Sequence, residues 1–170
     1  MSFTNLAKKR CSIRAYDPDP VEPDKIAAIV EAAHVAPSAA NRQPVRLIQV
    51  ESAEGLANLG RYANLYGAPL AFIVCADAER AWKRPVDGMV STAIDASITC
   101  DHMMIEATDL GLGSVWICAF DPAGVREAFN LPASLVPVNI LAVGHAADEW
   151  KSPERHAVER IPVQELVTKA

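Results

Sequence analysis

Apolar and polar positions alternate along the chain in two rhythms, which predict a mixture of helices and strands. Some apolar residues recur at helical spacing, and others form short continuous runs of strand length. We expect helices at residues 4–9, 23–35, 53–62, 91–110 and 122–129, and strands at residues 45–50, 70–76, 114–120 and 138–143. Proline and glycine support several of these boundaries, because proline suits a first helical turn and glycine commonly follows a helix end.

The predicted helix at residues 91–110 is the longest and is apolar on most of its sides. Its residues expected to be largely buried are Ile94, Ile98, Met103, Ile105 and Ala107. A helix of this kind must be enclosed by protein. A four- or five-stranded sheet beside the helix would enclose it, and so would a second copy of the chain.

Composition indicates an ordinary globular chain. Its 170 residues form one predicted domain, with 51% hydrophobic and 22% charged residues and a net charge of −5. The negative charge argues against general affinity for nucleic acid. The first residues show no signal-peptide pattern and no apolar run is long enough to span a membrane, so a cytoplasmic location is expected.

The four cysteines predict no disulfide framework. None is part of a Cys-x-x-Cys pair, which favours a reducing compartment. Cys75 and Cys118 stand in apolar strand patterns, where a free thiol behaves as a small core residue.

Positive charge is concentrated near both ends of this acidic chain. The cations there are Lys8, Lys9, Arg10, Arg14, Lys151, Arg155, Arg160 and Lys169. They either hold an anion between them or form a solvated surface. Arg10, Ser12 and Arg14 alternate, so in an extended segment they point the same way. Two guanidinium groups and a hydroxyl suit a phosphate, although an exposed edge strand has the same pattern.

The loop Ala36–Pro44 joins a predicted helix to a predicted strand. Two prolines stiffen it, and its small residues let another molecule approach. Ser38, Asn41 and Gln43 supply hydroxyl and amide groups. The loop is either a binding loop or a helix cap followed by a turn.

Motifs for hydrolytic or phosphate-loop chemistry do not occur in the sequence. His102 and Glu106 are one helical turn apart but lack a third ligand, so we expect no metal site. Gly111-Leu112-Gly113 is not followed by the glycine-rich helix start of a dinucleotide fold. If the protein is an enzyme, a cofactor is therefore expected to carry the reactive atoms.

Taken together and in this order, these segments resemble the FMN-dependent nitroreductase family. Arg10–Arg14 resembles the family's opening Arg-Arg-Ser-x-Arg, and Ala36–Pro44 resembles its Ala-Pro-Ser-x-x-Asn-x-Gln-Pro loop. Gly111–Ile117 is similar to Gly-Leu-Gly-x-x-Trp-Ile, Val136–Gly144 to the last core strand, and Arg160–Val163 to the C-terminal Arg-x-Pro segment. The resemblance covers nearly the whole chain.

The resemblance implies a single α+β FMN-binding domain over residues 1–170, with a central, mostly antiparallel sheet packed by helices. It also implies an intertwined homodimer with two FMN sites between its subunits. The phosphate and pyrimidine edge would contact Arg10, Cys11, Ser12, Arg14, Arg155 and Arg160. The partner chain would supply Pro37, Ser38, Ala39, Asn41 and Gln43. The isoalloxazine ring would lie along Trp116, Ile117 and Cys118.

The implied reaction is a ping-pong transfer. NADH or NADPH gives hydride to flavin N5, and the flavin then reduces a nitroaromatic, a quinone or a related acceptor. No side-chain acid or base is needed. Alternatives are a specialised flavoenzyme of the same fold, for reductive dehalogenation or flavin processing, a non-catalytic flavin-binding or sensing module, and an acidic interaction protein. Cys11, Val45 and Cys118-Ala119 depart from the family pattern.

Overall fold

The computed structural model describes residues 2–170 and contains the helices and strands that the sequence predicts, together with several short helical turns. In chain order they are α1 (Phe3–Lys9), α2 (Pro23–His34), η1 (Ala39–Asn41), β1 (Val45–Val50), α3 (Ala53–Leu59), β2 (Leu70–Asp77), α4 (Thr92–Asp109), β3 (Gly113–Ile117), α5 (Pro122–Ala128), β4 (Leu135–Gly144), η2 (Pro153–Arg155), α6 (His156–Glu159) and α7 (Val163–Leu166).

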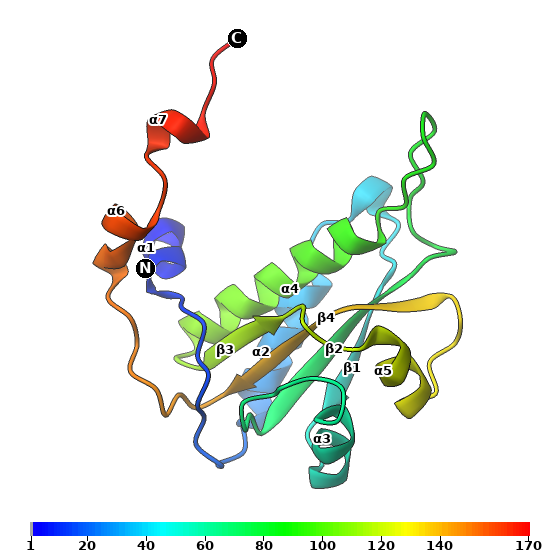
Figure 1. The fold of residues 1–170 in the computed structure, drawn as a ribbon, viewed down its shortest axis with the longest axis horizontal. Coiled ribbons are helices and arrows are strands. Elements are labelled where there is room, and N and C mark those ends of the chain that lie inside the picture. Colours follow the sequence, from blue (N-terminus) through cyan, green and yellow to red (C-terminus); the bar gives the residue numbers. More distant parts are fainter. Residues whose placement is uncertain (1) are drawn as a thin grey trace.

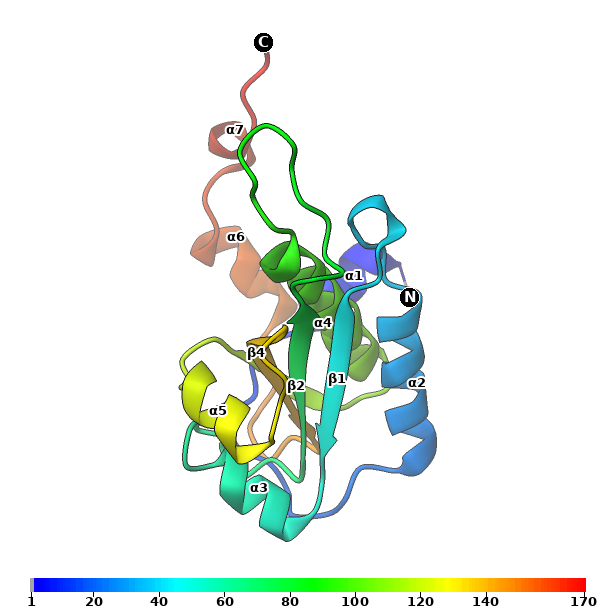
Figure 2. The same cartoon turned by 90° about the vertical axis from the view of Figure 1, so that its right-hand side faces the viewer.

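The four strands form one sheet in the order β1-β2-β4-β3. Every neighbouring pair of these strands is antiparallel, which confirms the expected sheet. Helices α2 and α4 pack on one face, while α3 and α5 cover the other (Figures 1 and 2). Because β2 lies inside the sheet and is covered on both faces, Leu70 to Ala76 form a continuous buried run.

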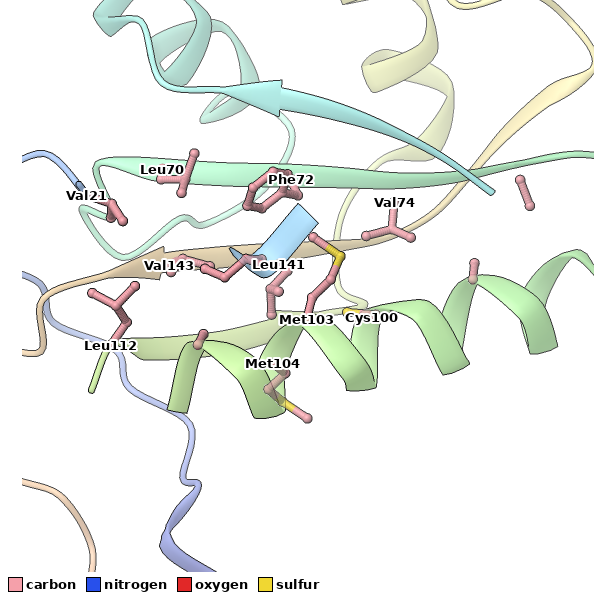
Figure 3. Packing of buried hydrophobic residues seen from close by; sticks show 14 residues of the cluster. Val21, Leu70, Phe72, Val74, Cys100, Met103, Met104, Leu112, Leu141 and Val143 are labelled. Atoms are coloured by element: carbon pink, nitrogen blue, oxygen red, sulfur yellow. The ribbon is translucent and has the colours of Figure 1, made fainter. Parts of the chain in front are cut away.

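Packing of α4 against the sheet builds the larger core cluster. Figure 3 shows Met103 of α4 beside Phe72 of β2 and Leu141 of β4, and all three side chains are fully buried. Cys100 joins this cluster, and its burial raises the pKa of the thiol well above its ordinary value. The thiol therefore stays neutral and acts as an apolar packing group.

The expected burial of α4 was wrong at one position. Ile94 is 49% exposed, because it lies on the side of the helix that faces away from the sheet. Met103 and Ala107 are fully buried as expected, while Ile98 and Ile105 are half-buried. In a single chain, the outer side of α4 therefore keeps an exposed apolar residue.

Two of the predicted strands have different bounds in the structure. Strand β3 stops at Ile117, because the chain turns so that Phe120 bridges Ala63. Cys118 thus lies outside the strand and is exposed, so its expected core role was wrong, whereas Cys75 is fully buried. Strand β4 begins earlier, at Leu135, and an irregularity in its pairing with β2 accommodates a proline within the strand.

Glycines shape the passage from α4 into β3. Gly111 has φ +79°, a left-handed conformation that suits glycine at a helix end. Gly113 has a different role, since a Cβ there would lie 2.9 Å from Cγ1 of Ile13. The missing side chain lets the segment around Ile13 lie against the start of β3.

We expect Gly113→Ala to lower the free energy of unfolding by about 1–3 kcal/mol, the usual cost of overpacking. Urea denaturation measures the loss. The double variant with Ile13→Ala should lose less than the sum of the two single losses, because the smaller side chain relieves part of the clash. Strict additivity would show that these two residues do not interact.

Candidate functional site

Basic side chains from both ends of the chain meet in one pocket. The pocket has a volume of about 250 Å³ and is lined by Arg10, Cys11, Ser12, Arg14, Lys151, Arg155, His156, Glu159 and Arg160. Of the cations noted near the two termini, five therefore lie together here. The pocket lies where the segment after α1 passes the segment around α6, beyond the β3 edge of the sheet (Figure 1).

The extended segment after α1 presents alternate residues to this pocket. Ser12 forms a parallel bridge with Ser114 of β3, and the amide of Ile13 donates to the Ser114 carbonyl at 3.0 Å. The side chains of Cys11 and Ile13 are only 4% and 1% exposed. The predicted alternation is thus confirmed: Arg10, Ser12 and Arg14 line the pocket while the side chains between them enter the core.

Arg155 braces the pocket through main-chain contacts. Its Nη1 donates to the carbonyls of Lys8 at 3.1 Å and Ser152 at 2.9 Å, and its Nη2 donates to the carbonyl of Arg10 at 2.5 Å. The guanidinium thus binds carbonyls at the end of α1, which a helix leaves without partners. Arg155 connects the two ends of the chain and positions Arg10.

Among the described residues, the pocket lining has five Lys and Arg side chains and one carboxylate, that of Glu159. Within residues 2–170, none of Arg10, Arg14 and Arg160 forms an ion pair with a carboxylate. Burial, and then the neighbouring charge of Arg155, lower the pKa of Arg10 from its ordinary value. Like charges held this close repel one another, so an anion in the pocket would relieve the repulsion.

The loop Ala36–Pro44 has a defined shape. Asn41 and Gln43 have φ values of 51° each, in the left-handed region that non-glycine residues seldom occupy. The Ser38 hydroxyl oxygen accepts the amide of Gln43 at 2.9 Å, which draws the ends of the loop together. The Gln43 side-chain amide donates to Oδ1 of Asn41 at 3.0 Å. This bond leaves the amide donor of Asn41 and the carbonyl acceptor of Gln43 on an exposed loop.

Within one chain, the loop and the basic pocket lie apart. The loop leads into β1, whereas the segment after α1 pairs with β3, and these strands are the two edges of the sheet. Three interstrand steps separate the edges by roughly 14 Å. The structure therefore does not bring Pro37, Ser38, Ala39, Asn41 and Gln43 together with the pocket residues of the same chain.

The third predicted group lies at the end of β3. Trp116 packs partly into the core under α4, and its Nε1 is buried without a hydrogen-bond partner in the part of the chain described. Ile117 points to the opposite face of the sheet and packs with α3 and α5. Cys118 is exposed. A ligand along this end of β3 would therefore contact the exposed Cys118, whereas Trp116 and Ile117 pack into opposite faces of the sheet.

His156 and Glu159 also line the pocket, although the sequence did not single them out for binding. Their signal is helical spacing, since His156 precedes Arg160 by one turn and its Nδ1 lies 3.4 Å from Nε of Arg160. His102 instead holds the carbonyl of Ile98 at 2.9 Å through Nδ1. Residues 2–170 contain no cluster of three or more His, Cys, Asp or Glu placed for a metal ion.

Among residues 2–170, no helix combines the length and the apolar character needed to cross a membrane.

Arg155→Ala should lower the free energy of unfolding by about 1.5–3 kcal/mol, because it removes hydrogen bonds from a charged donor to carbonyls of α1 and its neighbours. Urea denaturation measures this loss, and limited proteolysis should cut the N-terminal segment faster. Lys151→Ala is the matched control, since it removes a charge from the same pocket and none of these bonds. Equal stability of the two variants would contradict the bracing role.

Comparison with known proteins places this arrangement in a family. The family model described as Nitroreductase family matches residues 7–64 and 56–145. A solved nitroreductase family protein of Clostridium difficile is 48% identical, covers 99% of this chain and 98% of its own, and superposes with a TM-score of 0.96. A solved FMN-dependent nitroreductase of the same species is 28% identical, covers 93% and 96% of the two chains, and has a TM-score of 0.79.

A curated relative agrees with the two solved structures. It is a Bacillus subtilis protein named FMN reductase (NAD(P)H), which is 32% identical over 173 residues and matches 91% of this chain and 70% of its own length. The family match covers the segment after α1, the loop before β1 and the core strands. The chain belongs to the nitroreductase family.

Proposed function

We propose that this protein is an FMN-dependent oxidoreductase. It passes hydride from NADH or NADPH through flavin N5 to a nitroaromatic, a quinone or a related acceptor. The observation that carries this proposal is the basic pocket, in which Arg10, Arg14 and Arg160 converge without an acidic partner in the described chain. Relatives named FMN reductase and FMN-dependent nitroreductase support the same cofactor.

The pocket fits the phosphate end of FMN. A phosphate monoester carries a charge of about −1.5 to −2 near neutral pH, which three guanidinium groups can balance. Arg10, Arg14 and Arg160 would bind the phosphate, with Ser12 as a hydroxyl donor and Arg155 as the brace behind Arg10. Cys11 would contact the cofactor through its main chain, because its side chain is buried in the core.

The flavin ring would extend from this pocket along the end of β3, past Trp116, Ile117 and Cys118. A flavin pyrimidine edge has both acceptors and a donor, and the loop offers the complement. Among residues 2–170, the side-chain amide donor of Asn41 and the side-chain carbonyl acceptor of Gln43 have no partner. Pro37, Ser38 and Ala39 would line the same edge. Since one chain keeps loop and pocket apart, the loop would reach the pocket of a second copy.

Two further features support a homodimer. Apolar side chains are exposed on α4, at Ile94, and along the C-terminal segment, which extends away from the body of the chain in Figure 1. Those of the C-terminal segment are Val158, Ile161, Val163, Leu166 and Val167. Such a row of exposed apolar residues is typical of an interface. Light scattering should give twice the mass of one 18.3 kDa chain.

FMN, when bound, supplies the N5 atom that accepts hydride and releases it to the acceptor. The chain's own residues would bind and orient the cofactor. Arginines would fix the phosphate end and the loop would fix the pyrimidine edge, so that the ring is held in one orientation. Donor and acceptor would occupy the same face in turn, which gives ping-pong kinetics. A cytoplasmic location is part of the proposal, and four free cysteines agree with reducing surroundings.

Purified protein tests the cofactor directly. It should be yellow, or become yellow with added FMN, and denaturation should release FMN that chromatography identifies. NADH or NADPH should bleach the bound flavin, and a quinone or nitroaromatic should restore the colour. Colourless protein that FMN does not reconstitute would remove the basis of the proposal.

The runner-up is a specialised flavoenzyme of the same fold. The exposed Cys118 favours it, because a thiol at the end of β3 would narrow the approach to the ring. Turnover of a halogenated aromatic, with no turnover of quinones or nitro compounds, would favour this reading. A bound flavin that NADH and NADPH leave oxidised would instead point to a binding or sensing module.

Arg10→Ala and Arg160→Ala should each weaken FMN affinity by about 1.5–3 kcal/mol, the worth of a charge-assisted hydrogen bond. Flavin fluorescence titration measures the affinity. Riboflavin, which lacks the phosphate, should bind wild type and both variants alike. Lys9→Ala is the matched control, since Lys9 packs over Trp150, 5.5 Å from the ring centroid, outside the pocket. Unchanged FMN affinity in both arginine variants would show that the phosphate lies elsewhere.

A further inference from the structure

A buried carboxylate connects α4 to the loop before β1. Asp95 lies in the first turn of α4 and its side chain is 0% exposed. Oδ1 accepts the amide of Ala39 at 2.8 Å, and Oδ2 accepts the hydroxyl of Ser91 at 2.7 Å. No cation pairs with Asp95 among residues 2–170. The partial positive charge at the N-terminus of α4 favours the carboxylate instead.

Burial of an unpaired carboxylate is costly unless hydrogen bonds replace its water. The hydrogen bond from Ala39 offsets part of this cost and gives the buried carboxylate a structural role. That bond connects the middle of the loop to the longest helix of the structure, across 56 positions of sequence.

The loop needs such an anchor because its backbone is strained. Ala40, Asn41 and Gln43 all have positive φ values, of 49°, 51° and 51°. Conformations of this kind persist only where the surroundings fix them. The bond from Gln43 to Ser38 holds the two ends of the loop together, but it does not fix the loop relative to the body of the chain. The bond from Ala39 to Asp95 does.

We propose that Asp95 is a positioning residue for flavin binding. It holds the loop so that the side-chain amides of Asn41 and Gln43 meet the pyrimidine edge of the flavin bound to the partner subunit. The inference rests on the proposed function. Asp95 itself touches no cofactor, because its two oxygens are occupied by Ala39 and Ser91 in the interior.

Three variants separate this role from general stability. Asp95→Ala removes both hydrogen bonds. Asp95→Asn keeps an acceptor for Ala39 and gives its amide to the Ser91 hydroxyl, which can rotate to accept. Ser91→Ala removes the other bond of Asp95 and leaves the one to Ala39, so it is the matched control for α4.

Titration of each variant with FMN and with riboflavin measures the effect on affinity. Asp95→Ala should weaken both ligands by the same factor, about tenfold or more, because the loop contacts the ring that both share. This differs from Arg10→Ala, which should weaken FMN alone. Asp95→Asn should restore both affinities to within about threefold of wild type, and Ser91→Ala should stay equally close.

Hydrogen exchange gives a second readout that needs no flavin. Amides of residues 36–44 should exchange faster in Asp95→Ala and remain protected in Ser91→Ala and Asp95→Asn. If Asp95→Ala does not fold, Ala39→Pro removes the same donor from the loop side. The extended backbone of Ser38, with φ −134° and ψ 155°, permits a following proline, whose ring would occupy the place of the amide hydrogen and push the loop off Asp95. Ala39→Pro should then show the loss of affinity for both ligands.

Wild-type riboflavin and FMN affinities in Asp95→Ala, or in Ala39→Pro where Asp95→Ala does not fold, would overturn the positioning role and leave the proposed function intact. Equal losses in Asp95→Ala and Ser91→Ala, without rescue by Asp95→Asn, would also overturn it, since the effect would then come from α4 as a whole. Failure of wild-type protein to bind FMN would overturn both proposals.

Discussion

Packing of α4 against the sheet is the constraint on which the other parts depend. Its buried side contacts strands β2, β3 and β4 as well as α2, so its position is fixed by the core rather than by either candidate ligand segment. With 18 residues, the helix is about 27 Å long. Its first turn holds the loop through Asp95, and the strand that follows its last turn holds the segment with Arg10. A rigid rod of this length keeps the loop and the basic pocket of one chain at set positions, apart from each other.

The fold holds like charges close together in the basic pocket, which costs free energy. Arg10 and Arg155 lie close enough that burial and mutual repulsion lower the pKa of Arg10, yet the hydrogen bond between them keeps the pair together. Such an arrangement is expensive in an empty site and favourable once a doubly charged anion enters. Affinity for such an anion would therefore come largely from repulsion that folding has already imposed, which is a form of preorganisation.

Sequence patterns predicted most of the fold because local physics determines it. The run at β2 is buried on both faces, and the alternation from Arg10 to Arg14 follows directly from strand geometry. The features that sequence did not reveal depend on distant partners. Strand β3 ends where Phe120 bridges Ala63, and the Arg155 guanidinium donates to the main-chain carbonyl of Arg10, 145 positions earlier in the sequence. Ile94 looked like a core residue because an apolar helix does not reveal which side meets the sheet. The roles of the pocket and loop in binding FMN remain predictions.

The separation of loop and pocket at opposite edges of the sheet has a consequence for thermodynamics. If two copies complete the site as proposed, cofactor occupancy and subunit association are linked equilibria. Each flavin would then hold two chains together, and dilution would release both at once. A shared site would also allow complementation between two variants. A chain with a damaged pocket, paired with a chain whose loop is damaged, would form one wholly intact site and one doubly defective site. A mixed population of two inactive forms would regain part of its cofactor.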